Sequence, residues 1–159
     1  MSSHALRPAL ALAAVTVALV TLPAAAPAQA GSGAKTLYDR LGGVYPIAVV
    51  VDEFIDRLLV NEVLNANPAI ASARTRVPAP GLKFHVTALV CQATGGPCTY
   101  TGRAMKPAHA HLNISEREWR EMVRVFAEVL GRFTVPAAEQ AELMAIVETT
   151  RADIVVGAH

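Results

Sequence analysis

Apolar side chains recur along this chain at the three- and four-residue spacing of amphipathic α-helices. The clearest stripe lies between residues 45 and 59, where charged side chains occupy the opposite face. Its apolar members are Ile47, Val50, Val51, Phe54, Ile55, Leu58 and Leu59. A second stripe consists of Leu82, Val86, Leu89, Val90 and Ala93, and it ends at Gly95-Gly96-Pro97, a sequence typical of helix ends. Since no alternating pattern of useful length predicts a strand, we expect an all-α fold.

Two short helices are predicted next to glycine or proline residues. Residues 36–41 form the first, which stops at Gly42-Gly43, and residues 105–111 form the second, with Pro107 near its start. Between residues 60 and 80, several asparagines and prolines disfavour a long helix. We therefore expect that segment to be irregular.

The strongest local signal is a capping box formed by Ser115 and Glu118. It is preceded by Ile114, which is placed to pack against Trp119, so a long amphipathic helix begins at this point. The last helix opens at a proline, and its apolar positions run to residue 154. The chain thus predicts two short and four longer helices.

The first 30 residues differ in composition from the rest. They contain one charged side chain, Arg7, followed by an alanine-rich apolar run and the small-residue sequence Ala28-Gln29-Ala30. This pattern is typical of a secretory signal peptide cleaved after Ala30. A retained membrane anchor is the weaker alternative, because the run is short and contains prolines. We predict residues 1–30 as signal peptide and residues 31–159 as one domain, exported to the periplasm or secreted, with no stable membrane anchor after cleavage.

Composition and charge exclude several classes of protein. An apolar fraction of 53% excludes a disordered chain, and a formal net charge of +1 supplies no basic field for nucleic acid. Two cysteines are too few for a four-thiolate zinc site. Cys91 and Cys98 flank the Gly95-Gly96-Pro97 turn, so in an oxidising compartment they can form a disulfide. The alternative is a pair of reduced thiols, one of them buried as a small apolar residue.

Three histidines lie within the predicted helices. His85 shares a helix face with Leu82 and Leu89, whereas His109 and His111 are two residues apart and point in different directions. Each histidine taken alone is better explained as a surface or hydrogen-bonded side chain than as a metal ligand.

The order of these residues resembles that of group I truncated haemoglobins over about residues 36–155. The matching segments are Thr87–Arg103, Met105–His109, Leu37–Gly43, Val49–Phe54 and Val135-Pro136. The resemblance implies a two-over-two helical sandwich around haem b, an iron protoporphyrin, with His109 as the proximal iron ligand. A neutral imidazole suits this role, because its second nitrogen can donate to a backbone carbonyl.

The resemblance also implies the surroundings of the haem. The expected apolar wall consists of Phe54, Leu89, Met105 and Val123, and the expected propionate contacts are Tyr100, Arg103 and Lys106. Each of these three polar residues is explained equally well as an ordinary solvent-exposed side chain.

The distal side departs from the family pattern. Ile55 stands where many members have a tyrosine, and Leu82 and Val86 occupy positions that are often polar. None of the three can donate a hydrogen bond, which argues against tight oxygen storage and tyrosine-dependent nitric oxide dioxygenation. His85 matches a histidine that ligates iron from the distal side in some members, and Lys83 is a lesser distal candidate. The alternatives are that His85 swings outward or only hydrogen-bonds a ligand.

The leading interpretation is an exported haem protein that binds diatomic ligands such as oxygen, NO and CO. One alternative is a haem enzyme with peroxidase-like or nitric oxide-detoxifying activity. Another is an electron-transfer protein with a redox partner, and a third is a helical module without cofactor. No residue is assigned a catalytic role.

Overall fold

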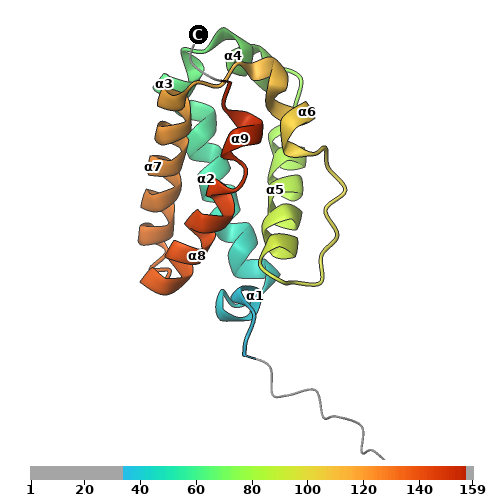
Figure 1. Ribbon diagram of the computed structural model, residues 1–159, viewed down its shortest axis with the longest axis vertical. Coiled ribbons are helices and arrows are strands. Elements are labelled where there is room, and N and C mark those ends of the chain that lie inside the picture. Colours follow the sequence, from blue (N-terminus) through green and yellow to red (C-terminus); the bar gives the residue numbers. More distant parts are fainter. Residues whose placement is uncertain (1–33, 157–159) are drawn as a thin grey trace, which may run out of the picture. The chain divides into compact units, whose positions relative to one another are not determined.

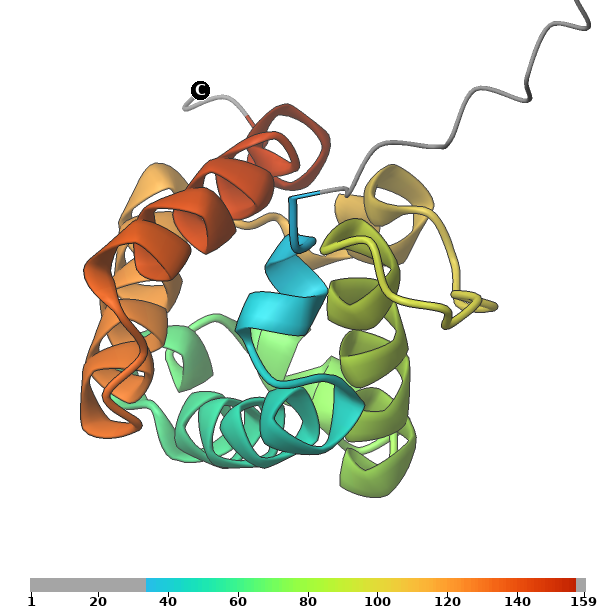
Figure 2. The same cartoon turned by 90° about the horizontal axis from the view of Figure 1, so that it is seen from below.

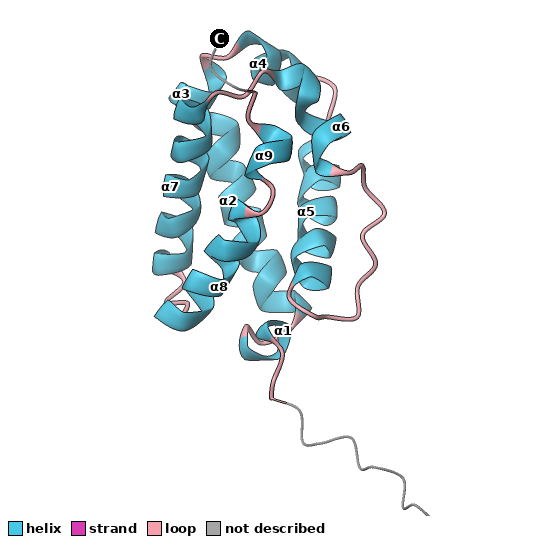
Figure 3. Cartoon of the chain, in the orientation of Figure 1, coloured by secondary structure: helices cyan, strands magenta, loops and turns pink. Residues whose placement is uncertain are grey.

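Helices form the regular structure of this chain. The computed structural model describes residues 34–156, and the signal peptide predicted at residues 1–30 lies outside them (Figure 1). The helices are α1 (Leu37–Arg40), α2 (Val44–Val60), α3 (Glu62–Asn65), α4 (Pro68–Arg74), α5 (Ala79–Ala93), α6 (Met105–His109), the 3₁₀ turn η1 (Ala110–Leu112), α7 (Glu116–Arg132), α8 (Ala137–Glu148) and α9 (Arg151–Ile154). Within the described range the β-structure is limited to one isolated bridge, between Ile114 and Val155, so the all-α prediction is confirmed (Figure 3). Among residues 34–156, none of the helices combines the length and the apolar composition that a membrane span requires.

The arrangement is built around α2. This helix packs against α5 on one side and α7 on the other, and α8 packs against α7 (Figures 1 and 2). The pairs α2/α5 and α7/α8 correspond to the predicted two-over-two sandwich. Short helices complete it, because α1 contacts α8, α3 contacts α7, and α6 contacts α9 and η1.

Two apolar clusters hold these helices together. One consists of Leu37, Phe126, Leu130 and Leu143, which join α1, α7 and α8. The other consists of Ile47, Val51 and Ile55 on α2, with partly buried side chains of α5 packed against it. Burying one such side chain fully stabilises the fold by about 1.5–3 kcal/mol. The spacing of the α2 stripe thus directs the helix toward both of its neighbours.

The glycine pair predicted to end α5 does so through its backbone conformation. Gly95 has φ +86°, and its N–H donates to the Gln92 carbonyl while the Gly96 N–H donates to that of Cys91 at 2.8 Å. This is a Schellman motif, which satisfies carbonyls at a helix end. At Gly96 a Cβ would lie 2.4 Å from the Tyr38 ring, so only glycine allows α1 to approach this turn.

The irregular segment predicted between residues 60 and 80 contains two helices, so that prediction is wrong. Asn61 and Asn67 begin α3 and α4, because their side-chain oxygens accept hydrogen bonds from backbone N–H groups of the first turns. Arg74, at the end of α4, donates to the carbonyls of Leu58 and Leu59 and so caps α2. The asparagines that argued against one long helix instead divide the segment into short ones.

The capping box at Ser115 and Glu118 is confirmed, and α7 follows it. The prediction of a single last helix is wrong, because the helix is interrupted between α8 and α9. The hydroxyls of Thr149 and Thr150 donate to carbonyls three residues earlier, a local bond that competes with helix continuation. The break lets α9 pack against α6, and the Val156 N–H then donates to the Ile114 carbonyl at 3.0 Å.

Candidate functional site

His109 is the last residue of α6 and is half-buried, whereas His111 is exposed. The Nδ1–H of His109 donates to the Met105 carbonyl at 2.8 Å, one turn earlier on the same helix. In the neutral imidazole this bond leaves Nε2 unprotonated, with its lone pair available to a metal. The expected difference between the two histidines and the expected carbonyl partner are both present.

His85 lies in the middle of α5, on the half-buried face of that helix. Its Nδ1 is buried and has no hydrogen-bond partner among the described residues. The ring lies edge-on to Tyr100, with 6.2 Å between centroids, and close to Phe84 at 5.4 Å. An unsatisfied buried polar group costs about 1–3 kcal/mol, so this imidazole is a candidate for a partner that is not protein.

The predicted distal residues are apolar and face the contact between α2 and α5. Ile55 is 3% exposed and belongs to the α2 cluster, against which Leu82 and Val86 pack. Phe54 contacts both clusters, and its ring lies 5.1 Å from that of Phe126. These side chains offer no hydrogen-bond donor, as the sequence predicts.

The remaining apolar candidates are less covered by protein. Leu89, Met105 and Val123 are half-buried, and they belong to neither apolar cluster of the described residues. They come from α5, α6 and α7, and the first two of these helices carry the histidines. Apolar side chains left partly open in this way are typical of a surface that receives an apolar ligand.

Tyr100, Arg103 and Lys106, the three residues expected near the haem propionates, differ in their contacts. Tyr100 donates its hydroxyl to the Arg103 carbonyl at 2.7 Å, and its backbone N–H donates to Gln92 Oε1 at 2.7 Å. The side chains of Arg103 and Lys106 are exposed and form no salt bridge with the described residues. They are thus available for an anionic group, while the Tyr100 hydroxyl is already used within the loop.

Lys83 does not take the distal position considered for it. Its ammonium lies 2.7 Å from Asp52 and 2.8 Å from Asp56, both on α2. The hydrogen bond with Asp52, then that with Asp56, raises the pKa of Lys83 above its ordinary value. This lysine therefore joins α5 to α2 and is occupied by two carboxylates.

Cys91 and Cys98 form a disulfide, as the sequence suggested. Cys91 is fully buried in the last turn of α5, and Cys98 lies in the loop that leads to α6. Sequence reasoning did not assign a role to Gln92, whose side chain also ties this loop to α5. The one feature of the sequence that points to this role of Gln92 is its position directly after Cys91.

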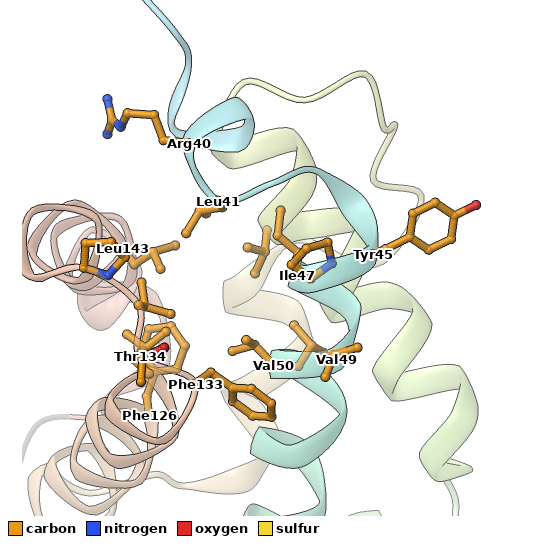
Figure 4. A pocket seen from close by; sticks show the side chains of 16 residues that line it. Arg40, Leu41, Tyr45, Ile47, Val49, Val50, Phe126, Phe133, Thr134 and Leu143 are labelled. Atoms are coloured by element: carbon orange, nitrogen blue, oxygen red, sulfur yellow. The ribbon is translucent and has the colours of Figure 1, made fainter.

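An apolar cavity of about 500 Å³ lies elsewhere, between the α1–α2 turn and the α7–α8 turn (Figure 4). Val50, Phe126 and Leu143 contribute to its lining, and Arg40 at its rim is paired with Glu139 and Glu142. None of the predicted site residues is among the described residues that line it. Since no histidine, cysteine or carboxylate is among the described residues that line it, the candidate site is located by the two imidazoles instead.

Comparisons with known proteins bear on the family and the fold of this chain. A sequence model of the family described as bacterial-like globin matches residues 36–156. The chain is 28% identical to Group 1 truncated hemoglobin GlbN of Mycolicibacterium paratuberculosis over 122 residues, which cover 77% of this chain and 85% of the relative. It is 31% identical to Group 1 truncated hemoglobin GlbN of a Nostoc species over 100 residues, covering 61% of this chain and 77% of the relative.

Solved structures give the same architecture. The 2/2 hemoglobin of Synechococcus sp. PCC 7002, in a cyanomet state with covalently attached heme, superposes with a TM-score of 0.67 at 22% identity. The match covers 76% of this chain and 98% of that one. The truncated hemoglobin of Tetrahymena pyriformis superposes with a TM-score of 0.62 at 23% identity, covering 77% of this chain and all of the other. The predicted two-over-two fold is thereby confirmed.

Proposed function

Since the chain belongs to the bacterial-like globin family, among the group 1 truncated haemoglobins, we propose that it binds haem b through His109 and takes diatomic ligands such as oxygen, NO and CO. The observation that carries this proposal is the hydrogen bond from His109 Nδ1–H to the Met105 carbonyl. That bond fixes the ring and its tautomer, so the proximal ligand is formed before any cofactor arrives.

The residues of the site fit a haem group on four counts. His109 has the donor chemistry of an axial ligand. Leu89, Met105 and Val123 leave half-buried apolar surface outside the two clusters. His85 has a buried nitrogen without a hydrogen-bond partner in the part of the chain that the structure describes. Arg103 and Lys106 are the exposed cations suited to the propionates.

Haem held by these residues would supply an iron that binds a diatomic ligand and exchanges one electron. Ile55, Leu82 and Val86 keep water away from the distal side and donate nothing to a ligand. Any polar interaction there falls to His85. We therefore propose that the distal side stabilises polar ligands only weakly. Its preference among diatomic ligands would depend on His85.

Export to the periplasm or the exterior is part of the proposal, with residues 1–30 as a cleaved signal peptide. The Cys91–Cys98 disulfide supports it, because disulfides persist in oxidising compartments and are rare in the cytosol. The test is the N-terminal sequence of the protein recovered from the cell envelope. A chain that begins at Gly31 supports cleavage after Ala30, and an intact Met1 in the cytosol contradicts it.

A second candidate function is electron transfer with a redox partner, through iron held by both His109 and His85. The buried Nδ1 of His85 favours it, because no hydrogen bond from the described residues holds this imidazole in a fixed orientation. In this alternative His85 competes with an external ligand for the distal position.

The deciding experiment is an optical spectrum of the purified protein with added haem, in the ferric and ferrous states. A six-coordinate low-spin spectrum that becomes high-spin in His85→Ala supports ligation by both histidines. A five-coordinate high-spin ferrous spectrum in the unsubstituted protein supports open binding of diatomic ligands. Absence of any haem spectrum contradicts the proposed function. Peroxide turnover that His109→Ala abolishes would instead support a haem enzyme.

A further inference from the structure

Residues 97–104, here called the return loop, connect the end of α5 to α6 by running back along α5 (Figure 1). The loop thus joins the helix that carries His85 to the helix that carries His109. Its contacts with α5 therefore bear on both imidazoles.

Three contacts tie the return loop to α5. Cys98 is bonded to Cys91, with 5.8 Å between their Cα atoms. The Tyr100 N–H donates to Gln92 Oε1 at 2.7 Å. The Tyr100 ring lies edge-on to the imidazole of His85, with an angle of 85° between the ring planes and 6.2 Å between the ring centroids. The contact of Cys98 is covalent. Tyr100, which makes the other two contacts, is two residues further along the chain.

Tyr100 also determines the shape of the loop itself. Its hydroxyl donates to the Arg103 carbonyl, and a Cβ at Gly102 would lie 2.3 Å from the Tyr100 hydroxyl oxygen. The ring therefore fills the space enclosed by residues 100–103. A displacement of Tyr100 would both open this turn and remove the edge contact from His85.

We propose that the Cys91–Cys98 disulfide is a clasp that holds Tyr100 against His85, so that Tyr100 is a positioning residue for the His85 imidazole. The proposal deepens the haem-binding function proposed above and rests on it for its consequence at iron. Opening the disulfide frees His85, and the share of haem iron that has this residue as distal ligand then changes.

The turn that precedes the loop does not depend on the disulfide. Gly95 and Gly96 are held by backbone hydrogen bonds to α5, and Tyr38 packs against Gly96. Opening the disulfide should therefore release residues 97–104 and leave the end of α5 intact. The clasp acts on one loop and not on the whole fold.

A dithiol reductant such as dithiothreitol supplies the chemistry of opening. One of its thiolates attacks the sulfur of Cys98, a half-buried residue, which breaks the Cys91–Cys98 bond and forms a mixed disulfide. Its second thiol closes a cyclic disulfide and releases Cys98. Two electrons pass from the reductant to the protein, and the two cysteine sulfurs become thiols by taking up two protons.

The first test uses the full chain without haem and measures how fast diethyl pyrocarbonate modifies each histidine, by peptide mass spectrometry. Opening the disulfide with dithiothreitol, or by the Cys91→Ala/Cys98→Ala double substitution, should speed modification of His85 about tenfold, which corresponds to about 1.4 kcal/mol. The exposed His111 serves as internal control and should not change. Equal His85 rates with the disulfide closed and opened overturn the proposal, whether or not haem binds.

Two Tyr100 variants separate positioning from general stability. Tyr100→Leu removes the ring and should speed His85 modification as opening the disulfide does. Tyr100→Phe keeps the ring and should retain the slow rate of the unsubstituted chain. Circular dichroism checks that each protein remains helical, and the reduced natural sequence replaces the double variant if that variant fails to fold. A rate that is unchanged in Tyr100→Leu contradicts the role of the ring.

The second readout is the ferric spectrum with haem bound. The fraction of low-spin iron should differ between the closed and opened disulfide, and the difference should disappear in His85→Ala. A changed His85 rate without any haem spectrum supports the clasp and contradicts the proposed function. A haem spectrum that is identical with closed and opened disulfide, together with unchanged His85 rates, contradicts the clasp and leaves haem binding supported.

Discussion

Helices α5 and α7 are similar in length but differ in how they are buried. The 17-residue α7 has five buried side chains, whereas the 15-residue α5 has one, Cys91. α7 is covered by α2 on one flank and by α8 on another. α5 packs mainly on α2, so Leu89 and His85 on the rest of its surface stay half-buried.

The difference separates the residues that fold the chain from those that serve the site. The apolar face of α7 is satisfied by other helices, and its hydrophobic burial therefore contributes to folding directly. The face of α5 that carries His85 and Leu89 has no comparable protein partner. In the proposed function haem covers that face, so substitutions there should affect cofactor binding more than folding.

The largest effect on the free energy of unfolding is expected for a substitution on α7. Leu130 is 1% exposed, and Leu130→Ala should lower the free energy of unfolding by about 2–5 kcal/mol, because it leaves a cavity in the core. Urea unfolding of the haem-free chain measures this. Val60→Ala, at a position 75% exposed, is the matched control and should change little. A cost at Leu130 no larger than at Val60 would contradict the comparison.

The next effect is at α6. His109→Ala should weaken haem binding by at least about 100-fold, since even loss of a supporting residue around a metal costs 10–100-fold. Haem titration followed at the Soret band gives the affinity. The exposed His111→Ala is the matched control and should bind normally. A five-coordinate spectrum of normal intensity in His109→Ala would remove His109 from the proximal role.

A smaller effect should appear at α5. Leu89→Ala should cost the haem-free chain no more than about 1 kcal/mol, because this side chain lies outside both apolar clusters. Haem affinity should fall about fivefold, the equivalent of about 1 kcal/mol of lost apolar contact. Thermal unfolding and haem titration of the same preparations give both numbers. The comparison fails if Leu89→Ala destabilises the haem-free chain as much as Leu130→Ala.

The smallest effect concerns a charge on α7. Hydrogen bonds from Arg124 and then Asn61 lower the pKa of Glu121 from 4.5 to about 2. A carboxylate with a lowered pKa stabilises the folded state above its unfolded pKa, and the contribution is lost as the pH falls from about 4.5 toward 2. Glu121→Gln should therefore cost about 0.2–1 kcal/mol at pH 7, and less at pH 3.

Urea unfolding at the two pH values measures this difference. Asp153→Asn, at an exposed carboxylate on α9, is the control. A cost for Glu121→Gln that is the same at pH 7 and pH 3 would mean that Glu121 acts through packing and not through its charge.

The features that the sequence predicted correctly depend on neighbouring residues. The α2 stripe, the Ser115–Glu118 capping box and the glycine end of α5 each act within a few residues, so their patterns are visible in the chain. The segment between residues 60 and 80 was misjudged, because asparagine both opposes a helix interior and caps a helix start. The break at Thr149 was missed, because hydroxyl bonds to the backbone leave no periodic signal.

For the site, residue type and the resemblance were enough to predict the candidate ligands and the apolar character of the distal side. The surroundings of each imidazole became visible only in the folded chain. His109 donates to a carbonyl of its own helix, and His85 is left between Tyr100 and Phe84 with an unpartnered nitrogen. The same structure assigned Lys83 to Asp52 and Asp56. The contacts of His85 with Tyr100 and of Lys83 with Asp52 and Asp56 join different elements of the fold, and residue spacing carries no record of them.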